Sequence, residues 1–278
     1  MHSDPSFEPL AAAEGGPSQV VRHGDTILRP VQPWTPTIHA VLRHLEAVGF
    51  AGAPRLVGDG YDGQGNEVLT YIPGEIIHPH AWSDEAIWRI GRLLRQLHDA
   101  TASFRPPPEA VWQPWSFHSD APGAIIGHCD TGPWHIVARD GLPVAFIDWT
   151  LAGPTDRRDE VAATGWWNAQ LHDEDIAEAN HLSDAVTRGT QLRHFLDGYG
   201  LPAAERVGLI THMIEFAIRD CAWEAIRAQV TPESTDPTPL WALAWRARAA
   251  AWMLRHRPTL QHAIEPYSPT TGPPGSSP

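Results

Sequence analysis

The pattern of apolar and polar positions divides the chain into a strand-rich beginning and a helix-rich remainder. Residues 18–30 contain two short apolar runs around a His-Gly-Asp turn, which predicts two strands. Residues 37–48 predict a helix, because one apolar stripe recurs at helical spacing: Ile38, Val41, Leu42 and Leu45. Residues 55–57 and 67–72 predict two more strands, separated by a turn rich in Gly and Asp. We therefore expect a small twisted sheet and one helix before about residue 72.

Helical patterns dominate after the break at Pro73-Gly74. Ser83 is the expected N-cap of a helix, and the acidic residues that follow it suit the positive helix end. The apolar positions of this helix have the required spacing: Ile87, Ile90, Leu94 and Leu97. A Pro-rich loop follows, and long helical patterns return after about residues 175, 202 and 239.

A β-hairpin is predicted in the centre of the chain. Residues 136–139 and 143–147 are apolar runs joined by Asp140-Gly141, a dipeptide that favours a type I′ turn because both central residues need φ > 0. With the turn centred between these two residues, position 148 lies opposite about position 133. The end of the second strand therefore returns beside the beginning of the first.

This geometry brings Asp148 close to His135 and to the loop that contains His128 and Asp130. Two carboxylates with one or two imidazoles can hold a divalent cation or act as acid and base. The alternative is that Asp130 caps a turn while the histidines are satisfied residues of the core.

Composition narrows the classes of function. Of the 278 residues 42% are hydrophobic, and the charge sum of 20 − 33 = −13 argues against a nucleic-acid surface, which needs clustered basic side chains. All basic residues are Arg, so any mechanism that requires a Lys is excluded. We predict a soluble, cytoplasmic protein with no membrane partner. The sequence has only two cysteines, shows no signal peptide, and has no apolar run near the ~18 residues of a membrane span. We expect the first six residues to fray and residues 267–278, rich in Pro, Gly and Ser, to be disordered.

Two central segments resemble a known family. Residues 127–135 (GHCDTGPWH) look like the HxDxxxxN catalytic loop of the aminoglycoside phosphotransferase family, relatives of the protein kinases. Residues 146–149 (FIDW) are similar to that family's metal-binding segment, 18 residues further on when the two aspartates are compared. Within a resemblance that covers roughly residues 15–260, three further segments match: the hinge-like 71–74, residues 97–99 and the helical 156–162.

The resemblance implies a two-lobed, kinase-like α+β fold. Residues 1–72 would form the nucleotide-binding lobe, and residues 73–266 the helical lobe that carries the catalytic loop. The implied activity is O-phosphorylation of a small-molecule hydroxyl, in an antibiotic or natural product, with ATP or GTP and Mg²⁺. A peptide hydroxyl is an alternative acceptor. A binding or immunity protein that keeps the fold without turnover is the rival from a different class.

The family pattern also assigns roles to single residues. Asp130 would be the catalytic base that accepts the proton of the acceptor hydroxyl, and Asp148 would bind the Mg²⁺ that bridges the nucleotide phosphates. His128 would brace the loop, and Asp159 would anchor it from beneath. These roles suit phosphoryl transfer, which depends on positioning and charge neutralisation more than on covalent chemistry.

Three departures from the family pattern concern charged or metal-binding positions. His135 replaces the Asn that is a second metal ligand, and imidazole suits Mn²⁺ better than Mg²⁺. Either His135 is a ligand and the metal preference has moved, or one metal suffices, or catalysis is impaired. Arg29 occupies the place of the phosphate-binding Lys, where it could grip phosphate or be a solvated residue at a strand end. The Glu that pairs with that Lys would fall at His39.

Other nucleotide contacts are expected from backbone groups. Gly16 and Ser18 lie between the first candidate strands, where N–H groups could face phosphates, although an ordinary β-turn is nearly as good an interpretation. Thr70 and Ile72 would supply backbone hydrogen bonds to the nucleobase, an expectation that rests on the resemblance.

The acceptor site has the weakest signals, and the sequence carries none for an oligomeric state. Acidic side chains could bind a cationic acceptor, or could form solvated helix faces: Asp173, Glu174, Asp175 and Glu178 in one cluster, and Asp220 and Glu224 one helical turn apart. Four tryptophans could line a pocket or belong to the core: Trp112, Trp115, Trp166 and Trp167.

Overall fold

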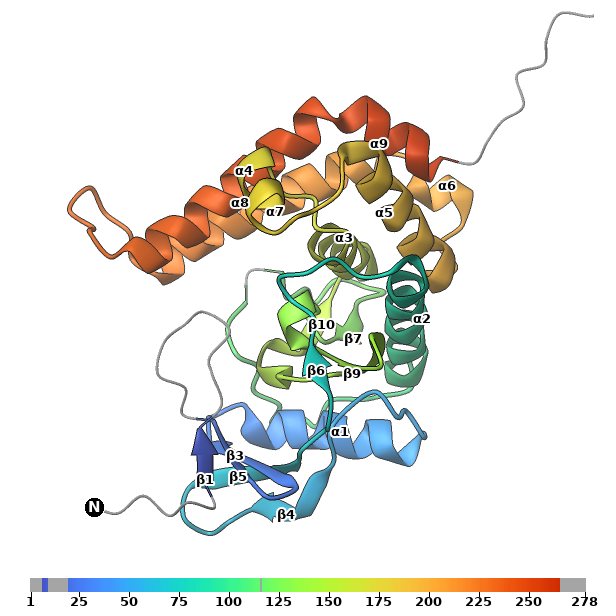
Figure 1. Ribbon diagram of the computed structural model, residues 1–278. Coiled ribbons are helices and arrows are strands. Elements are labelled where there is room, and N and C mark those ends of the chain that lie inside the picture. The colour runs from blue at the N-terminus through green and yellow to red at the C-terminus, as the bar shows by residue number, and fades with distance from the viewer. Residues whose placement is uncertain (1–6, 10–19, 116, 266–278) are drawn as a thin grey trace, which may run out of the picture.

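The structure is a computed structural model that describes residues 7–9, 20–115 and 117–265. Figure 1 shows a sheet-rich small lobe joined to a larger helical lobe. The α+β, kinase-like fold expected from the sequence is confirmed. The predictions for Gly16, for Ser18, for the first six residues and for the tail fall outside the described residues.

The small lobe is built on an antiparallel sheet of five strands in the order β1-β2-β3-β5-β4. The strands are β1 (Phe7–Pro9), β2 (Val21–His23), β3 (Thr26–Pro30), β4 (Leu56–Tyr61) and β5 (Asn66–Thr70). Helix α1 (Thr35–Ala47) follows β3, and its predicted apolar stripe is fully buried. The pairing of β3 with β5 sets Arg29 directly opposite Glu67.

The central hairpin is confirmed and forms a second sheet in the order β6-β8-β9. Its strands are β6 (Glu75–Ile76), β8 (Ile136–Arg139) and β9 (Leu142–Phe146). Asp140 and Gly141 both have positive φ, 51° and 72°, as a type I′ turn requires. At the open end, the Ile147 N–H donates to the His135 carbonyl over 2.9 Å, so the chain leaves β9 beside the start of β8.

Helices form most of the large lobe. They are α2 (Asp84–Thr101), α3 (Arg157–Asn168), α4 (Glu174–Ala179), α5 (Ala185–Tyr199), α6 (Ala203–Arg206), α7 (Leu209–Arg227), α8 (Pro237–Arg255) and α9 (Arg257–Ile264). The strand pair β7 (Ile125–Gly127) and β10 (Gly153–Thr155) lies between the hairpin and these helices. Ser83 caps α2 as expected, since its side chain accepts from the Ala86 N–H. Trp166 and Trp167 belong to the core, and Trp112 and Trp115 pack against it.

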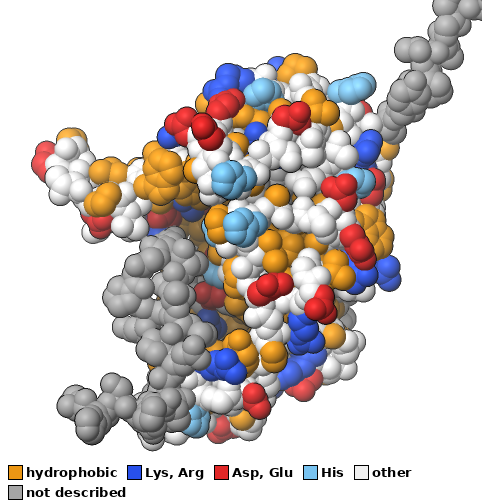
Figure 2. Space-filling view, viewed as in Figure 1, with side chains coloured by type: hydrophobic (Ala, Val, Ile, Leu, Met, Phe, Trp, Pro, Cys, Tyr) orange, Lys and Arg blue, Asp and Glu red, His pale blue; other side chains and the backbone are white. Residues whose placement is uncertain are grey.

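The acidic cluster near α4 is paired within the protein. Asp173 and Asp175 both bind Arg248 of α8, and Glu174 lies 2.8 Å from Arg255 of the same helix. These pairs connect α4 to the long antiparallel pair α7–α8, which projects from the body with hydrophobic side chains along it (Figures 1 and 2). Three of the four acidic residues therefore join helices, and their charges are not free to bind an acceptor. For Glu178, the acceptor-binding role stays a prediction. Among the described helices we find none with both the length and the apolar character to cross a membrane.

Candidate active site

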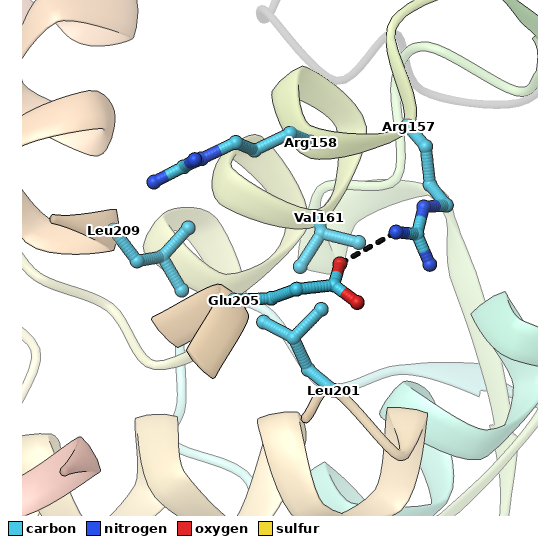
Figure 3. A pocket seen from close by; sticks show the side chains of 6 residues that line it. All are labelled: Arg157, Arg158, Val161, Leu201, Glu205 and Leu209. Atoms are coloured by element: carbon cyan, nitrogen blue, oxygen red, sulfur yellow. Dashed lines mark hydrogen bonds and ion pairs between the residues drawn. The ribbon is translucent and has the colours of Figure 1, made fainter. Parts of the chain in front are cut away.

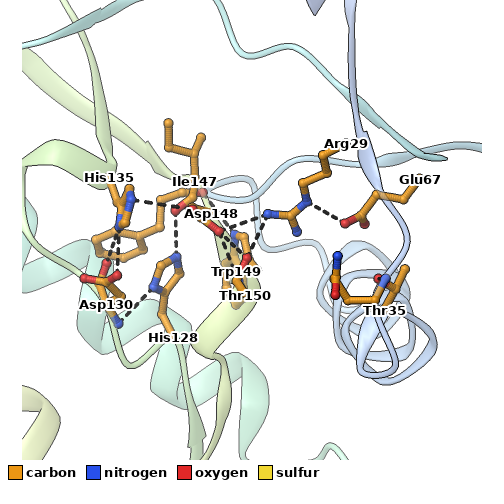
Figure 4. A network of polar contacts seen from close by, with 12 residues as sticks. Arg29, Thr35, Glu67, His128, Asp130, His135, Ile147, Asp148, Trp149 and Thr150 are labelled. Atoms are coloured by element: carbon orange, nitrogen blue, oxygen red, sulfur yellow. Dashed lines mark hydrogen bonds and ion pairs between the residues drawn. The ribbon is translucent and has the colours of Figure 1, made fainter. Parts of the chain in front are cut away.

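The hairpin brings three predicted site residues together at its open end. His135 ends the 3₁₀ turn Pro133–His135, and Asp148 follows β9 by two residues. The His135 Nδ1 atom lies 3.3 Å from Asp130 Oδ2, and its Nε2 atom lies 3.7 Å from Asp148 Oδ2 (Figure 4). The imidazole therefore stands between the two carboxylates. The side chains of Asp130 and Asp148 are 23% and 43% exposed, so both reach the surface.

Asp148 has an unusual backbone conformation that its neighbours stabilise. It is left-handed, with φ 56° and ψ 75°, a state that costs a non-Gly residue of order 1–3 kcal/mol. Its Oδ1 atom accepts hydrogen bonds from the Thr150 N–H, from the Thr150 hydroxyl and from Arg29 Nη1. These contacts hold the carboxylate in one orientation, with the Oδ2 atom toward His135.

His128 joins the two halves of the hairpin end. Its ring donates from Nε2 to the Ile147 carbonyl (2.9 Å), while its Nδ1 atom accepts from the Asp130 N–H (3.3 Å). Burial lowers its pKa to about 4, so the ring is neutral and can make both bonds at once. These contacts fit the bracing role that the resemblance implies.

The carboxylate beneath the loop is Glu160, and the expectation for Asp159 is wrong. Glu160 Oε1 accepts from the N–H groups of His128 (2.7 Å) and Cys129 (2.8 Å). Asp159 instead lies 2.8 Å from both Arg219 and His212. Consecutive residues on a helix point about 100° apart, so only one of the two can face the loop.

Two features of the sequence agree with the role of Glu160. His98, in the segment 97–99 that resembles the family, binds Glu160 Oε2 over 2.9 Å and Tyr199 Oη over 2.8 Å. Gly127 leaves room for the carboxylate, because a Cβ there would lie 2.0 Å from Glu160 Oε2. A buried network therefore runs from α5 through α2 and α3 to the loop.

Arg29 reaches from the small lobe into this site. Its Nη1 atom lies 2.9 Å from both Asp148 Oδ1 and Thr150 Oγ1, and its Nε atom lies 2.5 Å from Glu67 Oε1. The interpretation of Arg29 as a solvated residue at a strand end is thus excluded. The sequence did not predict Glu67 as the partner of Arg29. The expected pairing of two strands in this region could have suggested it, because Glu67 lies opposite Arg29. His39, at the position expected for the family's Glu, cannot supply a negative charge, but its Nε2 atom lies 3.0 Å from Glu67 Oε2.

The electrostatics of the site couple its carboxylates to its cations. Burial would lower the pKa of His135, but Asp130 and then Asp148 outweigh it and raise that pKa to about 9. Burial would likewise raise the pKa of Asp148, yet His135 and Arg29 hold it well below its ordinary value. At neutral pH the ionised carboxylate of Asp148 therefore lies between an imidazolium and a guanidinium.

The donor set suits a metal ion that arrives with other ligands. Among the described residues we find no group of three or more His, Cys, Asp or Glu side chains arranged around one metal position. Asp148 Oδ2 and His135 Nε2, 3.7 Å apart, could both contact one ion at about 2.1 Å. Mg²⁺ commonly takes one or two protein ligands and completes its shell with waters and phosphates. Binding through His135 would also release its proton.

The expected nucleobase segment is partly engaged elsewhere. The Thr70 N–H donates to the Arg55 carbonyl over 2.8 Å, and the Tyr71 N–H donates to the Asp25 carbonyl over 2.8 Å. The amide of Thr70 is therefore not available as a donor to a nucleobase, which corrects that part of the expectation. The Thr70 carbonyl and Ile72 stay predictions.

The side of the catalytic loop that faces α7 is acidic and aromatic. A cavity of about 10 Å³ adjoins the loop, and aromatic side chains from the 112–117 segment and from α3 and α7 line it. Asp220 on α7 is fully buried and binds Arg246 over 2.7 Å, but its Oδ1 atom has no hydrogen-bond partner among the described residues. Burial raises the pKa of Asp220, and the nearby charges of Asp130 and Glu224 add to this.

A second cavity lies away from the loop, between α3, α6 and α7 (Figure 3). Its volume of about 50 Å³ holds one or two waters, so it is too small for a nucleotide or an acceptor. Arg157 there is paired with Glu205, and Arg158 donates to the Val207 carbonyl.

Comparison with solved structures finds the same fold in several small-molecule kinases. The amicoumacin kinase hAmiN, in complex with AMP-PNP, Ca²⁺ and Ami, superposes with a TM-score of 0.61 at 14% identity, over 96% of this chain and 92% of that one. An aminoglycoside phosphotransferase from Alicyclobacillus acidocaldarius gives 0.55 at 17% identity, over 94% and 92%. The microcompartment-associated aminopropanol kinase gives 0.58 at 13% identity, over 92% and 93%. The chain therefore has the kinase-like fold of the aminoglycoside phosphotransferases.

Sequence comparison identifies a narrower group. No family model matches the chain. The trifolitoxin immunity protein of Rhizobium leguminosarum bv. trifolii is 51% identical over 251 residues, which are 90% of this chain and 96% of that protein. The chain belongs to the family of this immunity protein.

Proposed function

We propose that the protein protects a cell from a toxin by transferring a phosphoryl group from ATP or GTP to a hydroxyl of that toxin. The observation that carries this proposal is the pair of exposed carboxylates, Asp130 and Asp148, held on either side of His135. The fold, which small-molecule kinases share, supports phosphoryl transfer, and the similarity to an immunity protein supports protection from a toxin.

In the proposed reaction Asp130 is the base. Trp134 Nε1 donates to its Oδ1 atom over 3.3 Å, which orients the carboxylate while the Oδ2 side remains near His135. Asp130 takes the proton of the acceptor hydroxyl as the hydroxyl oxygen bonds to the γ-phosphorus, and the bond to the bridging oxygen of the nucleoside diphosphate breaks. A divalent metal, Mg²⁺ or Mn²⁺, would neutralise the phosphate charge, held by Asp148 with His135. Arg29 would bind phosphate oxygens.

We assign the nucleotide to residues 1–72, including Gly16, Ser18, the Thr70 carbonyl and Ile72, and the acceptor to the helical lobe of residues 73–266. The acidic and aromatic region at α7 favours an amine-bearing, cationic toxin, either a small molecule or a peptide. The unpartnered oxygen of Asp220 supports this choice, because a buried carboxylate oxygen gains from a cationic donor. The proposed compartment is the cytoplasm.

Immunity by binding alone is the second candidate. The observation that favours it is the direct contact of Arg29 with Asp148, 2.9 Å long, together with an imidazole where the family has an amide. These cations of the protein neutralise the carboxylate that a metal would otherwise neutralise. In this case the acidic region of α7 would hold the toxin without turnover.

One experiment separates the two candidates. Purified protein is incubated with trifolitoxin and ATP or GTP, with Mg²⁺ and then with Mn²⁺, and the toxin is weighed by mass spectrometry. Phosphotransfer predicts a gain of one phosphate that disappears in Asp130→Asn, and loss of protection in cells that express this variant. An unmodified toxin in every reaction, with Asp130→Asn still protecting cells, would establish binding alone.

A further inference from the structure

We propose that Glu67 and His39 are positioning residues that hold the Arg29 guanidinium in place for phosphate, with the carboxylate supplied by strand β5 and locked by helix α1. This inference rests on the proposed function, since it concerns how the nucleotide site is built. In the family that the sequence resembles, the carboxylate comes from the helix. Here the helix carries an imidazole, and the carboxylate lies on a strand.

The guanidinium of Arg29 is held by acceptors from both lobes. Arg29 and Glu67 are directly opposite each other on neighbouring antiparallel strands, a pairing that brings side chains within reach on one face of a sheet. The Nε edge of the guanidinium binds Glu67, and its Nη1 atom binds Asp148 and Thr150 of the other lobe. Figure 4 shows the guanidinium between these two groups of acceptors. Glu67 therefore decides how the planar guanidinium is turned toward Asp148.

The carboxylate of Glu67 is buried and fully paired. Its side chain is 3% exposed, and a buried carboxylate is tolerated only when its oxygens are paired. Oε1 faces Arg29 and Oε2 faces His39, so both oxygens have a partner. Strand β5 lies between β3 and β4 in the sheet, so its backbone is held on both sides. The carboxylate is thus a fixed point of attachment.

The ring of His39 is fixed beside Glu67 by its surroundings. Its side chain is 1% exposed, and its ring packs against Tyr61 with centroids 4.8 Å apart. Gly60 passes so close that a Cβ there would lie 2.7 Å from the ring, and its φ of +93° is one that side chains rarely adopt. The chain therefore keeps a space for this imidazole beside β4, and the ring stops Glu67 from turning away from Arg29.

The role predicts what the loss of either residue does. Without the charge of Glu67, Asp148 is the remaining carboxylate in contact with Arg29 among the described residues, and the guanidinium should move toward it. Arg29 would then compete with a metal for Asp148, and Asp148 would hold the guanidinium away from the phosphates, so nucleotide affinity should fall while the fold persists. Charge-assisted hydrogen bonds carry enough energy for roughly a tenfold effect.

The test uses the full chain and two readouts. The variants are Glu67→Gln, which removes the charge but keeps the shape, and His39→Phe, which removes the bond to Glu67. His39→Gln restores a donor and should behave like the wild type. Asp197→Asn is the matched control, because it breaks an Arg–carboxylate pair of similar length, 2.6 Å to Arg206, in the helical lobe. Circular dichroism checks that each variant is folded.

The first readout needs no nucleotide: phenylglyoxal labels accessible guanidinium groups, and peptide mass spectrometry follows the labelling rate of Arg29. The second is the dissociation constant of ATP with Mg²⁺ and with Mn²⁺. We expect Glu67→Gln and His39→Phe to change the labelling rate of Arg29 several-fold and to weaken ATP binding roughly tenfold, with the control unaffected.

The outcomes distinguish this inference from the proposed function. If the wild type binds no nucleotide but Arg29 labelling changes in both variants, the proposed function fails and the positioning role stands. If the wild type binds ATP while neither labelling nor affinity changes in Glu67→Gln, the positioning role is overturned and the proposed function survives. A His39→Gln variant as impaired as His39→Phe would reject the part assigned to His39.

Discussion

Replacing Glu160 with Ala tests how the catalytic loop is held. Glu160 is 3% exposed, and its side chain accepts hydrogen bonds from the N–H groups of His128 and Cys129 and from His98. The Ala variant leaves three buried donors without a partner, at about 1–3 kcal/mol for each. Removing one partner of a buried charged network typically costs about 3–5 kcal/mol, and we expect a loss in this range.

The matched variants are Glu160→Gln and Asp159→Asn. Gln keeps an acceptor for the two backbone N–H groups and can donate to His98 once that ring changes its tautomer, so a loss of about 1 kcal/mol is expected. Asp159→Asn weakens the contacts to Arg219 and His212 and leaves the loop intact. Phosphotransfer should therefore fall in Glu160→Ala and persist in Asp159→Asn.

Urea unfolding measures these losses, provided that the slope m stays constant and the midpoint alone moves. Phosphorylation of the toxin at a temperature where all variants are folded gives the second reading. If Asp159→Asn were as damaging to activity as Glu160→Ala, or if Glu160→Ala left stability unchanged, the account of the loop would be refuted.

Three further predictions concern single side chains. Asp130→Ala should lower turnover by roughly 10²–10⁴-fold and leave the ATP dissociation constant unchanged, and calorimetry beside a kinetic assay checks both values. His135→Asn should lower the Mn²⁺/Mg²⁺ activity ratio, whereas an unchanged ratio would show that His135 is not a ligand. Burial lowers the pKa of His172 to about 3, while the unfolded chain protonates near 6.5, so this residue's contribution to stability is present above about pH 6.5 and is lost as the pH falls below it. His172→Gln should flatten the decline of the urea midpoint between pH 7 and pH 5, and an unaltered slope would contradict the assignment.

Local interactions explain the features that were predicted well. The stripe of α1, the Ser83 cap and the Asp140-Gly141 turn each depend on residues a few positions apart, which sequence spacing records. The hairpin register is also local: the turn sets Arg139 opposite Leu142, and a bulge between Val137 and Ala138 then shifts the pairing by one residue. For that reason the proximity of Asp148 to His135 follows from the position of the turn in the sequence.

Contacts between distant segments explain the features that were missed. Whether Asp159 or Glu160 faces the loop depends on how α3 is rotated, and that rotation is set by packing against other helices. The acidic residues of α4 pair with arginines of α8, which lie more than 70 positions away in the chain.

The sequence by itself therefore determined the strand-rich and helix-rich parts, the hairpin and the grouping of Asp130, His135 and Asp148, since these follow from periodicity, turn chemistry and short loops. The kinase-like fold class followed from the family resemblance. Only the tertiary structure decided the partners of the buried charges. Arg29 meets Glu67 because two strands separated by a helix and a third strand pair in one register, and it meets Asp148 because the two lobes close on each other. Such pairings depend on which surfaces are buried together, and spacing along the sequence does not encode that.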